Sequence, residues 1–115
     1  MSATTVAGRY ARALFDAAAA QALTEQVDLD LALLAGELAA NKDFRTLLEG
    51  RALAMAKKKA LLTAAYAAAL QPLTLDFLCL VIDKEREAWL PDIIETYHQL
   101  HIAAQGICQA RLITA

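Results

Sequence analysis

The sequence contains few residues that interrupt helices and no large excess of charge of either sign. Glycine occurs 4 times and proline 2 times in 115 residues, and Lys, Arg, Asp and Glu together make up 21%. The formal net charge is −2, so the basic excess that binding to a phosphate backbone requires is absent. The basic run Lys57-Lys58-Lys59 is typical of a solvated helix face. We therefore predict no nucleic-acid partner.

Long, strongly apolar runs are also missing. A membrane-spanning helix needs roughly 18 consecutive apolar residues, and the run from Phe77 to Ile82 is far shorter. The N-terminus, Met1 to Val6, lacks the basic segment and following apolar stretch of a secretory signal. The sequence predicts a cytoplasmic protein with no direct membrane insertion.

Motifs that carry catalytic or metal chemistry are not found. Cys79 and Cys108 do not form a CxxC pair, and we interpret both as structural. His98 and His101 can share a helical face, but no further zinc ligands are suggested near them. The carboxylates are scattered, and GxGxxG, GxxxxGK[ST] and GxSxG motifs are absent. We predict no catalytic residues, no metal and no cofactor, and a protein that is not an enzyme.

The residues that are abundant favour helix. Hydrophobic residues make up 58% of the chain, with alanine and leucine dominant, which is ample for one core. Breaks are predicted near 22–24, at Asn41, at Gly50, at 71–72, near 89–91 and at Gly106. Thr24 and Asn41 suit N-caps, and Gly50 suits a C-cap. The expected fold is an all-α, six-helix bundle.

The last residues have a different character. Residues 107–114 are rich in β-branched side chains and too few for a separate helix, so we expect a short extended C-terminal tail. The predicted organisation is a helical bundle domain over 1–106, with 107–115 as a linker or the start of a missing C-terminal domain.

The first predicted helix has more apolar surface than one core requires. A helix that packs on a single core needs an apolar arc of little more than 100°, whereas here Arg9, Arg12 and Asp16 leave only a narrow polar strip. One apolar stripe contains Ala7, Ala11, Leu14, Phe15 and Ala18, and a second contains Val6, Tyr10, Ala13 and Ala17.

The segment from Leu73 to Glu87 shows the same excess, with Asp76 and Asp83 as its polar strip. Its stripes are Leu75, Leu78, Cys79 and Ile82 on one side and Leu73, Phe77, Leu80 and Val81 on the other. Two interpretations remain open: both helices are buried nearly all round, or their second stripes form a groove for an amphipathic helix of a partner. In the second case Asp76, Asp83 and Lys84 would form a polar rim.

Several pieces of the sequence, in order along nearly the whole chain, carry a family resemblance. Tyr10 to Phe15 reproduce a Tyr-Ala-x-Ala-Leu-Phe pattern that starts the first helix of the delta subunit of bacterial F-type ATP synthases, in the oligomycin-sensitivity-conferring protein family. The further matching pieces are NKDFRTLL at 41–48, Lys58 or Lys59 before Leu61-Leu62, FLCLVIDKER at 77–86, LPDII at 90–94 and ARLITA at 110–115. The last of these resembles the entry into the family's second domain.

The resemblance implies a function as well as a fold. It implies a non-catalytic stator component, at the cytoplasmic face of the bacterial inner membrane, that links the catalytic head to the peripheral stalk. It also implies that the N-terminal helix of an alpha subunit binds between the first and fifth helices, and that b subunits are contacted only through a C-terminal domain expected to be absent here. The residues onto which this groove carries over are Val6, Tyr10, Ala13, Leu14, Ala17, Phe77, Leu80 and Lys84.

The residues themselves leave two other hypotheses open. One is a free-standing helical adaptor that binds an amphipathic helix of another partner. The other is a bundle that binds a small ligand, or an enzyme, which a pocket with converging polar groups would favour.

Overall fold

Helices account for nearly all of the described backbone. The computed structural model describes the backbone of residues 3–49 and 55–114, and the side chains of residues 6–48 and 55–106. These ranges contain six α-helices, a short 3-10 helix η1 and no strand, so the predicted all-α, six-helix fold is confirmed. The elements are α1 (Ala3–Ala20), α2 (Thr24–Ala40), α3 (Lys42–Glu49), α4 (Met55–Tyr66), α5 (Pro72–Asp83), η1 (Glu87–Trp89) and α6 (Leu90–Thr114).

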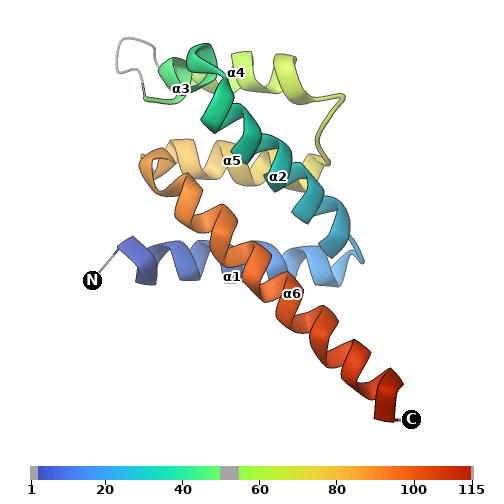
Figure 1. Cartoon of the computed structure of the whole chain (residues 1–115). Helices are drawn as coiled ribbons and strands as arrows, with labels where there is room; N and C mark the ends of the chain where they lie inside the picture. Colours follow the sequence, from blue (N-terminus) through green and yellow to red (C-terminus); the bar gives the residue numbers. More distant parts are fainter. Residues whose placement is uncertain (1–2, 50–54, 115) are drawn as a thin grey trace.

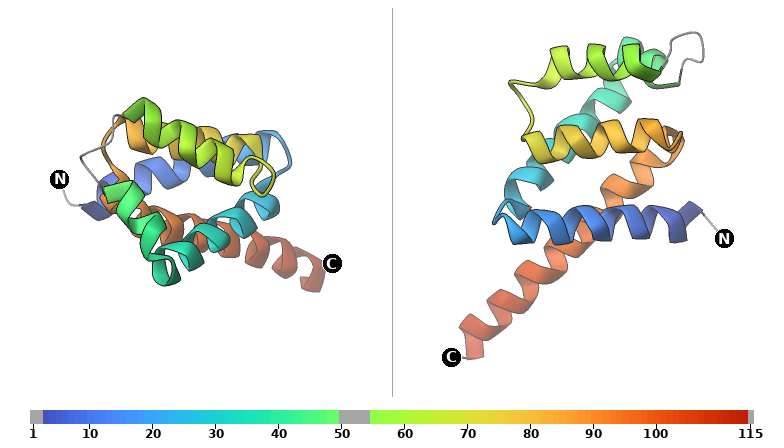
Figure 2. Two further views of the ribbon diagram at one scale, coloured as in Figure 1. Left: turned by 90° about the horizontal axis from the view of Figure 1, so that it is seen from above. Right: turned by 180° about the vertical axis from the view of Figure 1, so that it is seen from behind.

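The helices form two layers. α1 and α5 lie side by side and run in opposite directions, with α4 beyond α5 in the same layer (Figure 1). α2 and α6 cross this layer on one side, and α6 passes directly over α1 (Figures 1 and 2). The right-hand view of Figure 2 looks onto the other side of α1 and α5, where none of the described helices covers them.

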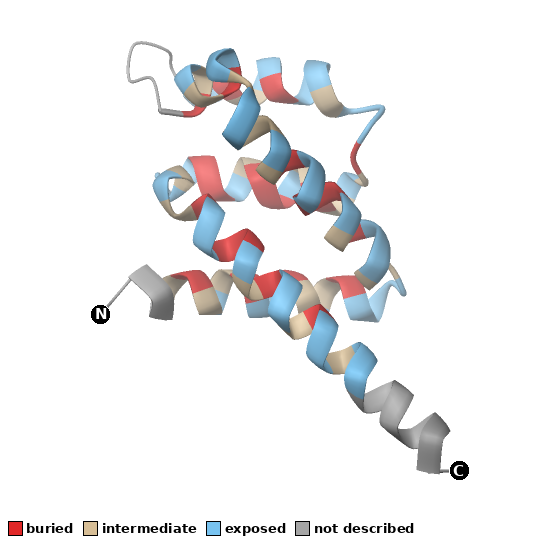
Figure 3. Cartoon of the chain, viewed as in Figure 1, coloured by how far each residue is buried: buried red, intermediate tan, exposed pale blue. Residues whose placement is uncertain are grey.

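The core lies between the two layers, where the buried faces of the helices meet (Figure 3). Ala7, Ala11 and Ala18 are fully buried, and their small side chains let α6 approach α1 closely. Tyr97 of α6 is also fully buried, and its ring packs edge-on against Phe15 with 5.6 Å between centroids. The other large, fully buried side chains include Leu14, Val27, Leu31, Leu34, Leu78, Val81, Ile82, Leu90 and Ile93.

Most of the predicted helix boundaries agree with the structure. Asn41 caps α3 as predicted, because its side-chain oxygen accepts a hydrogen bond from the Phe44 amide at 3.1 Å. Thr24 was predicted to cap α2 in the same way, and this is wrong: Leu23 holds the N-cap position and no side-chain cap bond forms. The predicted break at Gly50 lies outside the described residues.

The lysine run in α4 is not the solvated face that its composition suggested. Lys58 is buried, and its ammonium group donates a hydrogen bond to the Leu48 carbonyl oxygen at 3.0 Å, near the end of α3. The Glu87 carboxylate lies 3.8 Å from the same ammonium group. Lys59 is half-buried and forms an ion pair with Asp83 at 2.7 Å, so Lys57 alone of the three lysines is exposed. Two of these lysines therefore join helices, because carbonyl groups at a helix end and carboxylates attract a cation.

The predicted extended tail is wrong as well. α6 continues without a break from Leu90 through Gly106 to Thr114. Gly106 has a negative φ and does not act as a helix end. Gln, Ala, Arg and Leu in residues 107–114 are good helix formers, and extending an existing helix avoids the cost of starting a new one. The predicted domain division at residue 106 thus falls inside α6, and the division itself stays a prediction.

Candidate partner-binding groove

An apolar groove of about 850 Å³ runs between α1 and α5, on the side that α2 and α6 leave uncovered. Along α1 its lining extends from Val6 to Ala17, a stretch that rises about 16 Å at 1.5 Å per residue. This length corresponds to about three helical turns. The lining residues are Val6, Arg9, Tyr10, Ala13, Leu14 and Ala17 of α1, Leu73, Asp76, Phe77 and Leu80 of α5, and Arg86 and Trp89 of the connection to α6.

The floor of the groove is continuous with the core. Leu14 and Phe77 are 2% and 7% exposed, so their side chains belong to both. The rings of Tyr10 and Phe77 meet across the groove with 6.3 Å between centroids at an interplanar angle of 71°. This edge-to-face contact joins the two helices without filling the space above them.

The two stripes predicted on α1 differ in burial, although Leu14 of the first stripe also lines the groove. Ala7, Ala11 and Ala18 of the first stripe are fully buried against the core. In the second stripe Val6, Tyr10 and Ala17 are half-buried and Ala13 is exposed. The alternative in which α1 is buried nearly all round therefore does not hold.

α5 also keeps an apolar surface outside the core. Leu80 is 43% exposed and Leu73 is half-buried, and both line the groove. Val81, which is predicted to lie on the same stripe as Leu80, is fully buried. The apolar surface that α5 presents to the groove is thus narrower than the sequence predicts, because Val81, at one edge of that stripe, packs in the core.

A buried carboxylate on α2 holds the first turn of α5 in place. One oxygen of Asp30 accepts hydrogen bonds from the Gln71 amide and the Thr74 hydroxyl, both at 2.8 Å. It thereby satisfies a free amide at the start of α5, where Gln71 has no side-chain cap bond of its own. The sequence signal for this role is an acidic residue between two leucines, Leu29 and Leu31.

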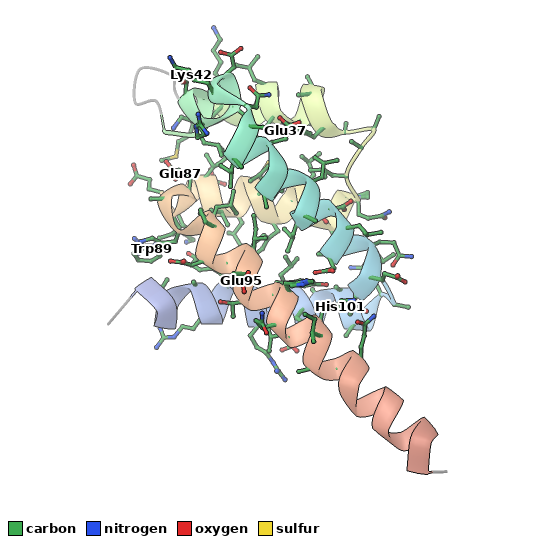
Figure 4. All side chains as sticks on the ribbon, viewed as in Figure 1. Glu37, Lys42, Glu87, Trp89, Glu95 and His101 are labelled. Atoms are coloured by element: carbon green, nitrogen blue, oxygen red, sulfur yellow. The ribbon has the colours of Figure 1, made fainter. Side chains whose placement is uncertain are left out.

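Charged and aromatic side chains occupy the edges of the groove. Arg9, Asp76 and Arg86 are exposed lining residues, and the Arg86 guanidinium lies 4.8 Å from the centroid of the Trp89 ring. Trp89 lies at the end of the molecule where α1 begins (Figure 4). The sequence predicts Trp89 only as part of a helix break, although tryptophan and arginine are both enriched among the residues that dominate binding interfaces.

Seven of the eight predicted site residues line this groove, and Lys84 does not. Lys84 is exposed and follows the last residue of α5. Asp83, the other charge predicted for the rim, is engaged with Lys59, and this hydrogen bond is the main cause that raises the pKa of Lys59. The structure thus brings the seven predicted apolar and aromatic residues together along one groove. The charged residues Asp83 and Lys84, which were predicted for its rim, are not among the lining residues.

The two histidines do not converge on one site. Nδ1 of His98 lies 3.0 Å from an Asp28 carboxylate oxygen, while His101 is buried in the packing of α6. Across the described residues, no group of three or more His, Cys, Asp and Glu side chains could hold a metal ion.

None of the described helices combines the length and apolarity that crossing a membrane would take.

The fold and the groove together define a class of protein: a small all-α bundle with an open apolar groove between two antiparallel helices. Comparison with known proteins assigns the family. The family model for the ATP synthase delta (OSCP) subunit matches residues 6–115. The chain therefore belongs to the ATP synthase delta (OSCP) subunit family.

Individual relatives agree with this assignment. The chain is 36% identical to "ATP synthase subunit delta" of Synechococcus elongatus over 106 residues, which are 92% of this chain and 59% of that protein. It is 32% identical over 115 residues to the protein of the same name from Salinibacter ruber, covering 100% of this chain and 60% of the relative. For Alkaliphilus metalliredigens the identity is 33% over 113 residues, with 98% and 63% covered. The chain thus spans about three fifths of the length of these relatives.

Proposed function

We propose that this chain is a stator part of an F-type ATP synthase and that its α1–α5 groove binds the N-terminal helix of an alpha subunit. Family membership supports the first part, because the relatives are named as subunits of that complex. The observation that supports the second part is the groove itself, whose apolar lining faces away from the core. In this role the chain is non-catalytic and peripheral to the cytoplasmic face of the bacterial inner membrane.

The dimensions and chemistry of the groove suit a helix. About three turns of an amphipathic helix match the length lined by Val6 to Ala17, and anchors at i, i+3, i+4 and i+7 would contact both walls. Ala13 and Ala17 are small, so the backbone of an incoming helix can approach α1 closely. The lining charges lie on the exposed edges and the lining between them is mostly apolar, which favours an amphipathic helix over a small polar ligand.

The mechanical role requires an attachment that dissociates slowly. A rotary enzyme does useful work only if its catalytic head is held against the torque of the rotor. Burial of several apolar anchors in a dry groove gives slow dissociation, whereas exposed ion pairs contribute at most about 1 kcal/mol each. Apolar burial is worth roughly 25 cal/mol per Å², and ordering the partner segment offsets part of it.

The test is titration calorimetry of the chain with a peptide from the N-terminus of the alpha subunit of the same organism. We expect one-to-one binding that Leu80→Asp weakens by at least about tenfold, because a carboxylate would be buried against apolar anchors. Ala13→Trp should abolish binding by filling the groove.

Leu61→Asp is the matched control, because Leu61 on α4 is 43% exposed, as Leu80 is, and lies outside the groove. Circular dichroism should show native helix content in all three variants. If the folded wild-type chain fails to bind the peptide, the proposal is wrong. It is also wrong if Leu61→Asp weakens binding as much as Leu80→Asp does.

A further inference from the structure

The charges that line the groove are distributed unevenly along it. We propose that an acidic side chain of the docked helix pairs with Arg9 and Arg86, and that this pairing sets the direction in which the helix lies in the groove. This inference rests on the proposed function, because it concerns the occupant of the same groove. It adds the chemistry of that occupant: a carboxylate near one end of its apolar face.

Arg9 and Arg86 lie toward the same end of the groove. Tyr10 of α1 and Phe77 of α5 contact each other, and the two helices are antiparallel. Arg9 precedes Tyr10 and Arg86 follows α5, so both lie toward the end where α1 begins. The side chain of a helical residue leans toward the N-terminus of its helix, which moves the Arg9 guanidinium further in that direction.

Asp76 lies toward the other end. It precedes Phe77 on α5, and the same lean directs its carboxylate toward the beginning of α5, away from the two arginines. No described acidic residue lies within 4.0 Å of the cationic nitrogens of Arg9 or Arg86, and no described basic residue lies that close to Asp76. The groove therefore offers two cations on one side of the Tyr10–Phe77 contact and an anion on the other side.

Arg86 is held in a defined position rather than on a loose loop. Its amide donates to the Val81 carbonyl oxygen at 2.9 Å, and its own carbonyl oxygen accepts from the Trp89 amide at 2.9 Å. Its guanidinium lies over the Trp89 ring, a cation–π contact, and the residue is exposed. A stacked arginine can still donate hydrogen bonds to a carboxylate. A pre-positioned arginine loses less side-chain freedom when it binds, so it can discriminate between two orientations of the same helix.

The experiment measures affinity for the same alpha-subunit peptide, by calorimetry and by the fluorescence of Trp89, the single tryptophan. Arg9→Glu and Arg86→Glu are each compared with Lys57→Glu, an equal charge change at an exposed residue of α4 outside the groove. We expect each charge reversal at a groove arginine to raise the Kd for the peptide about tenfold at low salt. At about 0.5 M salt the increase should be much smaller, since the lost interaction is electrostatic. Lys57→Glu should change Kd less than about twofold.

A charge exchange then identifies the partner group. Each acidic residue of the peptide is replaced in turn by lysine, and one replacement should bind Arg86→Glu more tightly than it binds the wild-type chain. If both arginine reversals behave like Lys57→Glu, or if no peptide replacement restores binding, the inference is wrong while wild-type binding leaves the proposed function standing. Absence of wild-type binding overturns both.

Discussion

Asp30 shows how a single polar residue positions the groove. The residue lies on α2 and is 8% exposed, and its carboxylate accepts two hydrogen bonds from the beginning of α5, the helix that forms one wall. A buried carboxylate is costly unless its oxygens are satisfied, and here the amide of Gln71, the hydroxyl of Thr74 and the positive end of α5 supply that compensation. The groove wall and the core are therefore tied together through one side chain.

Asp30→Ala should lower the free energy of unfolding by about 2 kcal/mol, because hydrogen bonds to a charged acceptor are lost and the Gln71 amide loses its partner. Chemical denaturation with circular dichroism measures the change. In a double-mutant cycle, the effects of Thr74→Val and Asp30→Ala on the free energy of unfolding should not be additive, since one hydrogen bond joins the two side chains. Asp16→Ala is the control: Asp16 pairs with Arg12 on the surface, where both side chains are more than 60% exposed, and a change below about 0.5 kcal/mol is expected. Equal effects of the two alanine variants would contradict the role given to Asp30.

At the scale of elements, the ends of α1 and α5 share one geometry. Leu23 donates to the Ala18 carbonyl oxygen at 2.8 Å and Ala22 to Ala19 at 3.2 Å, the two bonds of a Schellman motif. At the end of α5, Arg86 bonds Val81 and Glu85 bonds Ile82 in the same pattern. The left-handed position of each motif holds a residue other than glycine, with φ of 57° at Ala22 and 56° at Glu85. A side chain at positive φ costs energy that glycine avoids.

Ala22→Gly and Glu85→Gly should therefore each leave stability unchanged or raise it, by up to about 1 kcal/mol, as measured by urea denaturation. Ala19→Gly is a control with the opposite expected effect. Ala19 is exposed and lies inside α1, so the same change there should lower the free energy of unfolding by about 0.5–1 kcal/mol. A loss of stability from Ala22→Gly as large as that from Ala19→Gly would show that the left-handed turn is not under strain.

At the scale of the whole molecule, Tyr97 of α6 contacts both layers: its ring packs against Phe15 of α1, and its hydroxyl group bonds α2. The Tyr97 hydroxyl of α6 donates a hydrogen bond to the Thr24 carbonyl oxygen at the start of α2, at 2.8 Å. Burial raises the pKa of Tyr97 well above its ordinary value of 10.0, and the nearby charges of Asp28 and Asp30 raise it further. Burial also raises the pKa of Tyr66.

Stability should consequently fall as pH rises above about 10. The unfolded chain releases the tyrosine protons near pH 10, whereas the folded chain retains them to higher pH. Because the unfolded state then binds fewer protons, the free energy of unfolding decreases with pH in this range, and it is unaffected by these groups below it. Denaturation at pH 8 to 11.5 measures the slope, and Tyr97→Phe should be less stable by about 1 kcal/mol at pH 8 but show a shallower decline. A slope in Tyr97→Phe as steep as in the wild type would assign the alkaline loss to other groups.

The sequence by itself determined the helical class, the helix boundaries at Asn41, Pro72 and Leu90, and the excess apolar stripes on α1 and α5. These features follow from local periodicity and from residues that cap or break helices, which act within one or two turns. Tertiary structure alone decided that Asp30 meets Gln71 and Thr74, that Lys58 meets the end of α3, and that Arg86 and Trp89 complete the groove where Lys84 was expected. Those contacts join residues far apart in the chain or on different sides of a turn, so they depend on how the helices pack. For the same reason the residues after Gly106, whose composition favoured an extended tail, continue the helix that precedes them.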